Sequence, residues 1–408
     1  MQERVIFHID VNSAFLSWEA VERLKNGEST DLREIPAAVC GDRETRHGVI
    51  LAKSIPAKRY GVTTGEPVVD ALRKCPTLTL VSSNHAMYKE KSRAFMDILR
   101  QYSDVIEQFS IDEAFVDMTG TKRLFGVPEE AAARMKEQIR NELGFTVNVG
   151  ISSNKLLAKM ASDFKKPDRV HTLFPEEIAT KMWPLPVRDL FFVGKAAEKK
   201  LYGMGIRTIG DLAQADPQAL THVLKKQGEV LWRYANGLDD SPVETESPDA
   251  KGYSNSITVP MDITESGEAK KVLLSLTENV CRRLRQDEVR VETVTVQIRF
   301  NDLTRASHQC PLPAATNITQ EIYDNVCRLF EEMWDGTPIR LLGVSTAKVT
   351  REAQGRQMSL FDSTDYEKLE KLDSAMDSIR SRFGAGAVQR ASSLQMQQEK
   401  KKGEKQEK

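Results

Sequence analysis

The pattern of apolar and polar residues in the N-terminal part of the chain predicts strands and helices that alternate. Residues 5–10 form a short apolar run that ends in an aspartate, which is typical of a buried strand. Residues 13–24 follow with apolar side chains at helical spacing. The further strands predicted in this part are 36–42, 48–54, 78–81, 105–110, 113–119 and 146–152, and the further helices are 85–102, 128–143 and 153–164, with two short helical pieces inside 55–76.

This order of elements indicates a ferredoxin-like fold. Apart from an insertion after the first helix, the chain runs strand, helix, hairpin, helix, strand, which is the split βαβ pattern. The first strand and the hairpin should then lie side by side in one sheet. Asp10 ends one of these strands, and Asp112 and Glu113 begin another. We therefore expect three carboxylates from distant parts of the chain to meet at one edge of the sheet.

The rest of the chain divides into a helical module, a linker and a second α/β unit. Residues 186–240 carry glycines at turns between short helices, as in a helix–hairpin–helix module whose backbone amides hold a phosphate. Residues 239–252 are acidic and contain two prolines, which is typical of a linker. Residues 252–349 again mix strands and amphipathic helices. A helical stretch and a polar end close the chain after residue 350.

Composition narrows the class of protein without identifying its function. Hydrophobic residues make up 40% of the 408 positions and charged residues 29%, and no stretch has the ~20 apolar residues of a membrane span. The charged start of the chain does not resemble a signal peptide, so a cytoplasmic enzyme without a membrane partner is expected. Five scattered cysteines favour neither disulfides nor a zinc site.

The net charge of −1 does not predict nucleic-acid binding by itself. A basic surface would have to come from clustering of side chains. One short span of the second α/β unit does concentrate arginine, at Arg282, Arg283, Arg285, Arg290, Arg299 and Arg305.

The predicted carboxylate group points to metal chemistry. Neighbouring buried carboxylates repel one another unless a cation lies between them. Mg²⁺ prefers oxygen ligands, and two such ions about 3.5–4 Å apart can stabilise the attacking and leaving oxygens of a phosphoryl transfer. The residues alone leave a second interpretation open, in which Asp10 caps a helix and Asp112 and Glu113 only occupy a turn.

Two motifs resemble those of Y-family translesion DNA polymerases, the ImpB/MucB/SamB or DNA polymerase IV-like family. The run FSIDEAFVDMT at 109–119 is similar to the second metal motif of that family, and FHIDVNSAFLSWE at 7–19 to the first, with Asn12 in place of its second acid. The resemblance implies that Asp10, Asp112 and Glu113 are catalytic. It also implies that they bind two Mg²⁺ ions together with the carbonyl of Val11.

The same resemblance assigns three residues to the incoming nucleotide. Phe15 matches the steric gate, an aromatic ring that excludes a 2′-hydroxyl. Lys166, before a proline, matches a lysine that contacts phosphates. Lys58 stands where the family has an arginine, and Ile55 where a tyrosine is common. Lysine keeps the charge but loses the bidentate geometry of arginine, so the effect on nucleotide binding stays open.

The resemblance covers residues 4–362 and implies an α+β multidomain fold shaped as a right-hand polymerase. Its parts are a ferredoxin-like palm, small fingers, a helix–hairpin–helix thumb and an α/β little finger. The expected boundaries are 1–18 and 79–166 for the palm, 19–78 for the fingers, 167–240 for the thumb, 241–251 for a linker, 252–349 for the little finger and 350–408 for a tail.

The tail contains QMSLF at 357–361, which resembles the peptide that docks bacterial polymerases onto the sliding clamp. Gln357 would enter a small polar pocket, while Leu360 and Phe361 would fill an apolar one. The bacterial sliding clamp is therefore an expected partner. The alternative is a stray turn that packs on the last domain.

The family resemblance thus predicts a DNA-directed DNA polymerase that works as a monomer on primer–template DNA and deoxynucleoside triphosphates. It implies low-fidelity synthesis past damaged bases. A non-catalytic, clamp-bound DNA scaffold is the second hypothesis, supported by the changes at Ile55 and Lys58. A nucleotidyl cyclase is the third, because a ferredoxin-like palm can also bind two metals.

Overall fold

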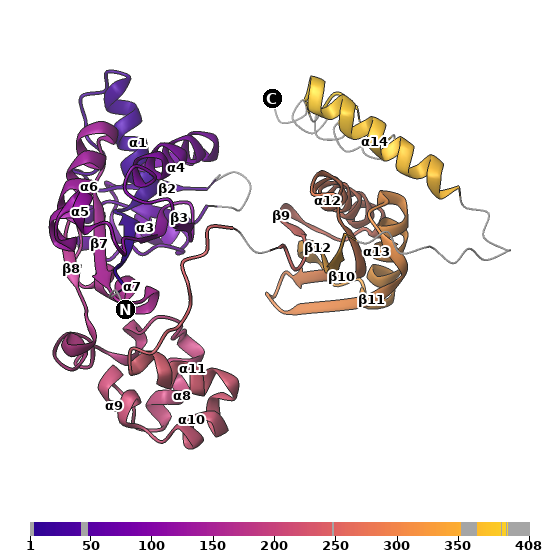
Figure 1. The fold of residues 1–408 in the computed structure, drawn as a ribbon. Helices are drawn as coiled ribbons and strands as arrows, with labels where there is room; N and C mark the ends of the chain where they lie inside the picture. Colours follow the sequence, from indigo (N-terminus) through magenta and orange to yellow (C-terminus); the bar gives the residue numbers. More distant parts are fainter. Residues whose placement is uncertain are drawn as a thin grey trace. The chain divides into compact units, whose positions relative to one another are not determined.

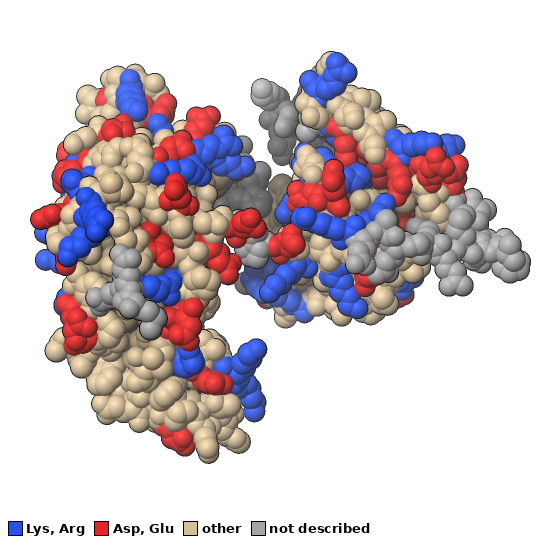
Figure 2. Space-filling model, in the orientation of Figure 1, with Lys and Arg blue, Asp and Glu red and all other residues tan. Residues whose placement is uncertain are grey.

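The computed structural model describes residues 4–41, 48–246, 249–351, 365–384, 386–388 and 390, and these form two compact units (Figure 1). Unit 1 contains the described residues up to 246, and unit 2 contains those from 249 onward. Within these ranges, no helix is long and apolar enough to cross a membrane. Basic and acidic side chains are intermixed on the visible face of each unit (Figure 2), as the near-zero net charge leads one to expect.

Unit 1 is organised around a five-stranded sheet in the order β5-β6-β1-β7-β8. Neighbouring strands run antiparallel except β7 and β8, which are parallel. The predicted pairing of the first strand with the hairpin is confirmed. β8 was not predicted, and it lies beyond residue 166, the expected end of the palm. The strands are β1 (Ile6–Val11), β5 (Ile106–Gln108), β6 (Glu113–Asp117), β7 (Val147–Ser152) and β8 (Val170–Thr172).

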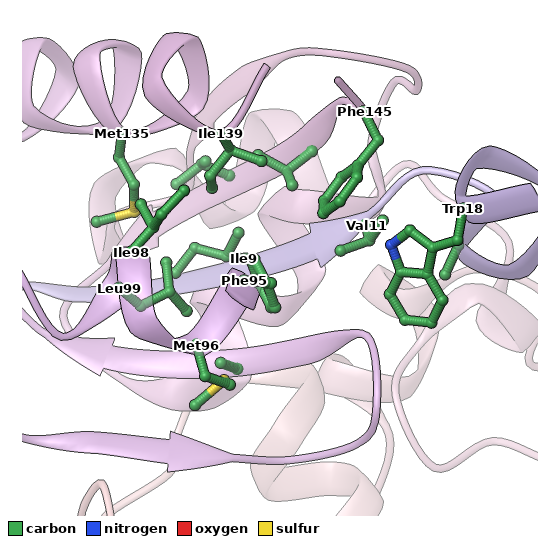
Figure 3. Close-up of a cluster of buried hydrophobic side chains, with 14 of the residues drawn as sticks. Ile9, Val11, Trp18, Phe95, Met96, Ile98, Leu99, Met135, Ile139 and Phe145 are labelled. Carbon is green, nitrogen blue, oxygen red and sulfur yellow. The ribbon is translucent and has the colours of Figure 1, made fainter. Parts of the chain in front are cut away.

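Residues of β1 alternate between two buried faces of this sheet. Phe7, Ile9 and Val11 belong to the main apolar core of the unit. Ile9 and Val11 are labelled in Figure 3. Helices α4 (His85–Leu99) and α6 (Pro128–Leu143) supply much of that core. Because successive side chains of a strand point to opposite faces, His8 and Asp10 lie together on the other face. Helix α7 (Lys155–Asp163) packs on β1 and β7 there, since His8 contacts its Ser162.

Gly150 allows α7 to lie close against β7. A Cβ atom built on Gly150 would lie 1.9 Å from the carbonyl oxygen of Ala158 and 2.4 Å from the amide nitrogen of Ser162. Both atoms belong to the backbone, so neither can move without shifting the helix. The residue without a side chain therefore sets the distance between α7 and the sheet.

We expect the substitution Gly150→Ala to destabilise unit 1 by about 3 kcal/mol or more, because overpacking against backbone atoms forces the helix to shift. Chemical denaturation followed by circular dichroism measures the change. Gly203→Ala is the matched control, since no atom lies within 4 Å of the added Cβ and the stability should change little. Equal stability of the two variants would contradict the close approach of α7.

Two smaller parts complete unit 1. The first is the insertion after α1 (Ala14–Lys25), a three-stranded sheet in the order β3-β2-β4 with short helices and its own apolar core. The second is a helical module after β8, also with its own core. The insertion contains β2 (Ala37–Cys40), β3 (Ile50–Lys53), α2 (Ile55–Arg59), α3 (Val68–Lys74) and β4 (Thr79–Ser82), and a short helix α5 (Lys122–Phe125) follows the hairpin.

The helical module begins with three short 3-10 or π turns and continues with four α-helices. Gly194 is the N-cap of the first α-helix, and Gly205 has a φ of 81° in the turn after it, where the left-handed conformation favours glycine. The predicted glycine turns between short helices are thus present. The elements are η1 (Pro175–Glu177), η2 (Ile178–Met182), η3 (Val187–Asp189), α8 (Lys195–Gly203), α9 (Ile209–Gln214), α10 (Pro217–Leu224) and α11 (Lys226–Ala235).

Unit 2 repeats the split βαβ order around a sheet of order β11-β10-β12-β9. The two helices inside this order pack against the sheet and share its core. A further helix, α14, follows at the C-terminal side. The elements are β9 (Ser254–Ile263), α12 (Ser266–Gln286), β10 (Arg290–Phe300), β11 (Arg305–Thr316), α13 (Thr319–Met333), β12 (Ile339–Thr350) and α14 (Tyr366–Phe383).

The expected arginine cluster is partly neutralised by α14. Arg285 donates to Asp377 at 2.7 Å and to Asp373 at 3.2 Å, and it is shielded from solvent. Arg290 lies 3.4 Å from Glu370 on the same helix. These two arginines hold the C-terminal helix against unit 2, and only the remaining members of the cluster are left for a polyanion.

Candidate active site

The sheet brings the three predicted carboxylates together at backbone level. Asp10 and Glu113 are register partners in the antiparallel pair of β1 and β6. The amide of Val11 donates to the carbonyl of Asp112 at 3.0 Å. The strand order read from the sequence therefore places the two motifs in direct contact, although 102 positions separate Asp10 from Asp112 in the sequence.

A pocket of about 250 Å³ opens beside this contact. Asp10 and Asp112 both line it, together with Val11 and the ring of Phe15. The insertion closes the other side of the pocket through residues of β3 and a following turn. The complete lining is Asp10, Val11, Ser13, Ala14, Phe15, Leu51, Ala52, Lys53, Thr64 and Asp112.

The Glu113 side chain does not line this pocket and instead contacts residues of α7 and β1. Its Oε2 accepts from Lys159 Nζ at 2.6 Å and lies 3.2 Å from His8 Nε2. Among the residues that the structure describes, no three Asp, Glu, His or Cys side chains form a group that could hold a metal ion. The expected three-carboxylate group is therefore present in the backbone arrangement, whereas the side chains of only Asp10 and Asp112 share the pocket.

Asp10 is also paired with a lysine. Lys166 Nζ donates to its Oδ1 at 2.8 Å and lies 2.9 Å from Asp163 Oδ1. Lys166 was predicted to contact phosphates, and here its ammonium pairs with Asp10, a predicted metal ligand.

The carboxyl groups of Asp10 and Glu113 have very different pKa values. Burial raises the pKa of Asp10 to about 6, against the opposing effect of Lys166. Burial also acts to raise the pKa of Glu113, but the hydrogen bonds from His8 and Lys159 outweigh it and lower the pKa to about 2. Glu113 is thus fully ionised at neutral pH, and Asp10 becomes ionised only near neutrality.

His8 is fully buried and was not singled out in the sequence. Burial lowers its pKa to about 4, so the ring is neutral at physiological pH. Its Nδ1 lies 2.8 Å from the hydroxyl of Ser162. That hydroxyl donates its own hydrogen to the carbonyl of Lys159 at 2.8 Å. The period of two along β1 could have identified His8, because it shares the face of Asp10.

The oxygen donors of the pocket fit a hard divalent cation. Asp10 and Asp112 contribute carboxylates, and Val11 also lines the pocket. Mg²⁺ is held in proteins by one or two carboxylates plus substrate phosphates, which matches this set. Asp10 and Glu113 each carry a lysine ammonium as counter-charge, so the site already balances its negative charge with cations.

Phe15, the predicted steric gate, is one of the residues that line the pocket. Its ring stacks on Tyr88 with centroids 4.4 Å apart and planes 11° apart, and His85 meets its edge at 5.9 Å. The hydroxyl of Tyr88 in turn donates to Glu19 at 2.7 Å. One face of the Phe15 ring is therefore fixed by packing against Tyr88, and the residue also lines the pocket.

Lys58 does not line the pocket, whereas Lys53 does. Lys58 is exposed on α2, and Lys53 Nζ donates to Thr64 at 3.1 Å. Burial, and then the charge of Lys58, lower the pKa of Lys53, so the two ammonium groups lie close enough to repel. Lys53 was missed in the sequence, where a lysine at the end of the apolar strand ILAK was the available signal.

The proposed clamp peptide cannot be placed. Gln357, Leu360 and Phe361 lie outside the described residues. Their assignment stays a prediction from the sequence pattern.

Comparison with known proteins covers both units. Family models match residues 9–163 as the impB/mucB/samB family, 250–360 as the C-terminal domain of that family, and 188–239 as the thumb domain of DNA polymerase-iota. The chain is 44% identical over 396 residues to DNA polymerase IV of Clostridium acetobutylicum, covering 97% of this chain and 99% of that one. It is 40% identical over 402 residues to DNA polymerase IV 2 of Bacillus subtilis, covering 97% and 95%.

A solved structure shares the fold. A Y-family DNA polymerase chimera superposes with a TM-score of 0.70 at 22% sequence identity, over 85% of this chain and 99% of that one. The α+β multidomain architecture expected from the sequence is thereby confirmed.

Proposed function

This chain belongs to the impB/mucB/samB family of Y-family DNA polymerases, and we propose that it extends a primer by two-metal phosphoryl transfer in the pocket of Asp10 and Asp112. Its substrates are primer–template DNA and deoxynucleoside triphosphates. The observation that carries the proposal is that these two carboxylates share a pocket with the Phe15 ring and with Lys53.

Four groups of this chain are suited to hold the metal ions. They are the carboxylates of Asp10, Asp112 and Glu113 and the carbonyl of Val11. Two bound Mg²⁺ ions would supply Lewis-acid stabilisation of the attacking hydroxyl and of the leaving pyrophosphate. The carboxylates orient this chemistry, because the paired strands β1 and β6 fix the backbone positions of Asp10 and Glu113.

Basic side chains around the pocket bind the triphosphate. Lys53 lies on the lining and Lys58 lies beside it, so both can neutralise phosphate charge from the side of the insertion. Lys166, which contacts Asp10 in the free protein, is the third basic residue for the phosphates. Phe15 packs under the sugar, where its ring excludes a 2′-hydroxyl.

The family supports three further parts of this proposal. As a Y-family enzyme, this chain synthesises DNA past damaged bases with low fidelity. The five-stranded sheet is the palm, the insertion is the fingers, the helical module is the thumb, and unit 2 is the little finger. The chain acts as a monomer and binds the bacterial sliding clamp through Gln357, Leu360 and Phe361.

Primer extension on defined templates tests the two-metal mechanism. We expect the insertion rate in single turnovers to rise more steeply than in proportion to the Mg²⁺ concentration, because two ions must bind, and to vanish in a chelator. The inserted base should follow the template.

Other outcomes separate the alternatives. Binding of primer–template without extension would support the DNA scaffold. A cyclic nucleotide formed without template would support the cyclase. A rate that rises in simple proportion to Mg²⁺ would contradict the two-metal mechanism while leaving the polymerase activity in place.

A further inference from the structure

Lys159 is a buried basic residue for which the mechanism above has no use. It lies in the middle of α7, with the whole residue 8% exposed. Its ammonium donates to Glu113 Oε2 at 2.6 Å. In the described part of the chain, the other side chain in contact with this carboxylate is His8, whose Nε2 lies 3.2 Å from Oε2. Lys159 thus places an ammonium group directly against Glu113.

Aromatic rings hold this ammonium in place. Lys159 Nζ lies 5.6 Å from the centroid of Phe109 and 5.4 Å from that of Phe191, and the two rings meet edge to face. A cation over the face of an aromatic ring is stabilised by the ring quadrupole, more so where water is excluded. Phe109 comes from the catalytic hairpin and Phe191 from the loop before α8. The lysine is therefore positioned by three separate parts of unit 1.

The same helix carries a similar arrangement one turn earlier. Lys155 Nζ lies 2.6 Å from Glu107 Oε2 and 5.0 Å from the centroid of Phe115. Residues four apart on a helix lie on the same face, so the two lysines are neighbours. Glu107 is not among the predicted metal ligands. The chain thus contains a lysine–glutamate pair at the site and a matched pair beside it.

We propose that Lys159 is a positioning residue that holds Glu113 as its resident counter-ion and competes with a metal ion for it. The inference rests on the proposed two-metal function. A carboxylate that is already paired with a close ammonium attracts a second cation less strongly, because the ammonium repels that cation at short range. Lys159 accordingly keeps the affinity for metal low in the free protein. The negative charge of the triphosphate then favours metal binding when substrate arrives.

Titration of the full-length protein with Mn²⁺, followed by electron paramagnetic resonance of the free ion, tests this without DNA, nucleotide or catalysis. We expect Lys159→Met to bind Mn²⁺ at least about tenfold more tightly than wild type, since it removes the ammonium that contacts Glu113. Lys159→Arg keeps the charge and should stay within about threefold of wild type. Lys155→Met should leave the affinity unchanged.

Two results would overturn the inference. One is an affinity of folded Lys159→Met that equals or falls below that of wild type. The other is equal tightening in Lys155→Met, which would indicate a general charge effect. Melting curves in a chelator verify folding, and Lys159→Gln replaces the methionine variant if that variant does not fold.

A further variant separates this inference from the proposed function. Asp112→Asn should abolish Mn²⁺ binding at the proposed pocket. If it binds Mn²⁺ as wild type does, the metal does not occupy the proposed pocket, and the proposed function itself fails. If Asp112→Asn loses binding while Lys159→Met is unchanged, the inference about Lys159 alone is wrong.

Discussion

Replacing Asp10 with asparagine is expected to reduce primer extension at least about 1,000-fold and, at the same time, to stabilise the metal-free protein. The loss follows because a metal ligand contributes several kcal/mol to the transition state, and each factor of ten corresponds to about 1.4 kcal/mol. The gain in stability follows because asparagine removes a buried negative charge. Asp10 is 9% exposed, and burial raises its pKa from the ordinary value of 3.8 to about 6.

The direction of the stability effect depends on pH. A carboxyl group whose pKa is higher in the folded than in the unfolded protein destabilises the fold once it ionises. This cost is absent below pH 3.8, grows between pH 3.8 and 6, and is complete above pH 6. At neutral pH it amounts to roughly 2–3 kcal/mol, so Asp10→Asn should raise the melting temperature of unit 1 by roughly 5 °C.

Thermal unfolding in a chelator at pH 7.5 and at pH 4 measures this effect. The stabilisation should be present at the higher pH and almost vanish at the lower one. Asp163→Asn is the control, because that carboxylate also pairs with Lys166 but its side chain is 50% exposed, and surface ion pairs contribute about 0–1 kcal/mol. Destabilisation by Asp10→Asn at pH 7.5 would show that the Lys166 pair outweighs the burial of the charge.

Replacing Phe15 with valine is expected to reduce discrimination against ribonucleotides by about 100-fold. A steric pocket that loses several carbon atoms loses roughly 1–3 kcal/mol of selectivity. The ring lies on the pocket wall and cannot rotate away, because Tyr88 stacks on it and is itself hydrogen-bonded to Glu19. The smaller side chain removes this barrier and leaves Asp10 and Asp112 in place.

Single-nucleotide insertion with matched ribo- and deoxynucleotides measures the ratio of kcat/KM values. Deoxynucleotide insertion by Phe15→Val should stay within about tenfold of wild type. Tyr88→Phe is the control, since it removes the hydrogen bond to Glu19 but keeps the aromatic support. Unchanged discrimination in Phe15→Val would make Phe15 a packing residue of the first helix and remove it from the nucleotide site.

Much of the fold could be predicted from the sequence, because it depends on local patterns. The apolar run that ends at Asp10 and the turn at Asp112 are short-range signals, and the order of elements around them leaves few ways to build a sheet. The predicted strand pair β1–β6 followed directly. Strand β8 was missed, because three half-buried residues carry almost no periodicity and are ordered by their pairing with β7.

In the candidate site, the backbone arrangement was predictable from the sequence, whereas the directions of the side chains were not. Which acids meet in the backbone could be predicted from the sequence, since an alternating strand and a fixed register are properties of neighbouring residues. Where their side chains point depends instead on packing between distant elements. Glu113 faces Lys159 because Gly150 lets α7 approach the sheet, and Lys53 reaches the pocket because strand β3 of the insertion packs against α1. Such contacts join residues far apart in the chain, and their geometry comes from packing, which no local pattern encodes.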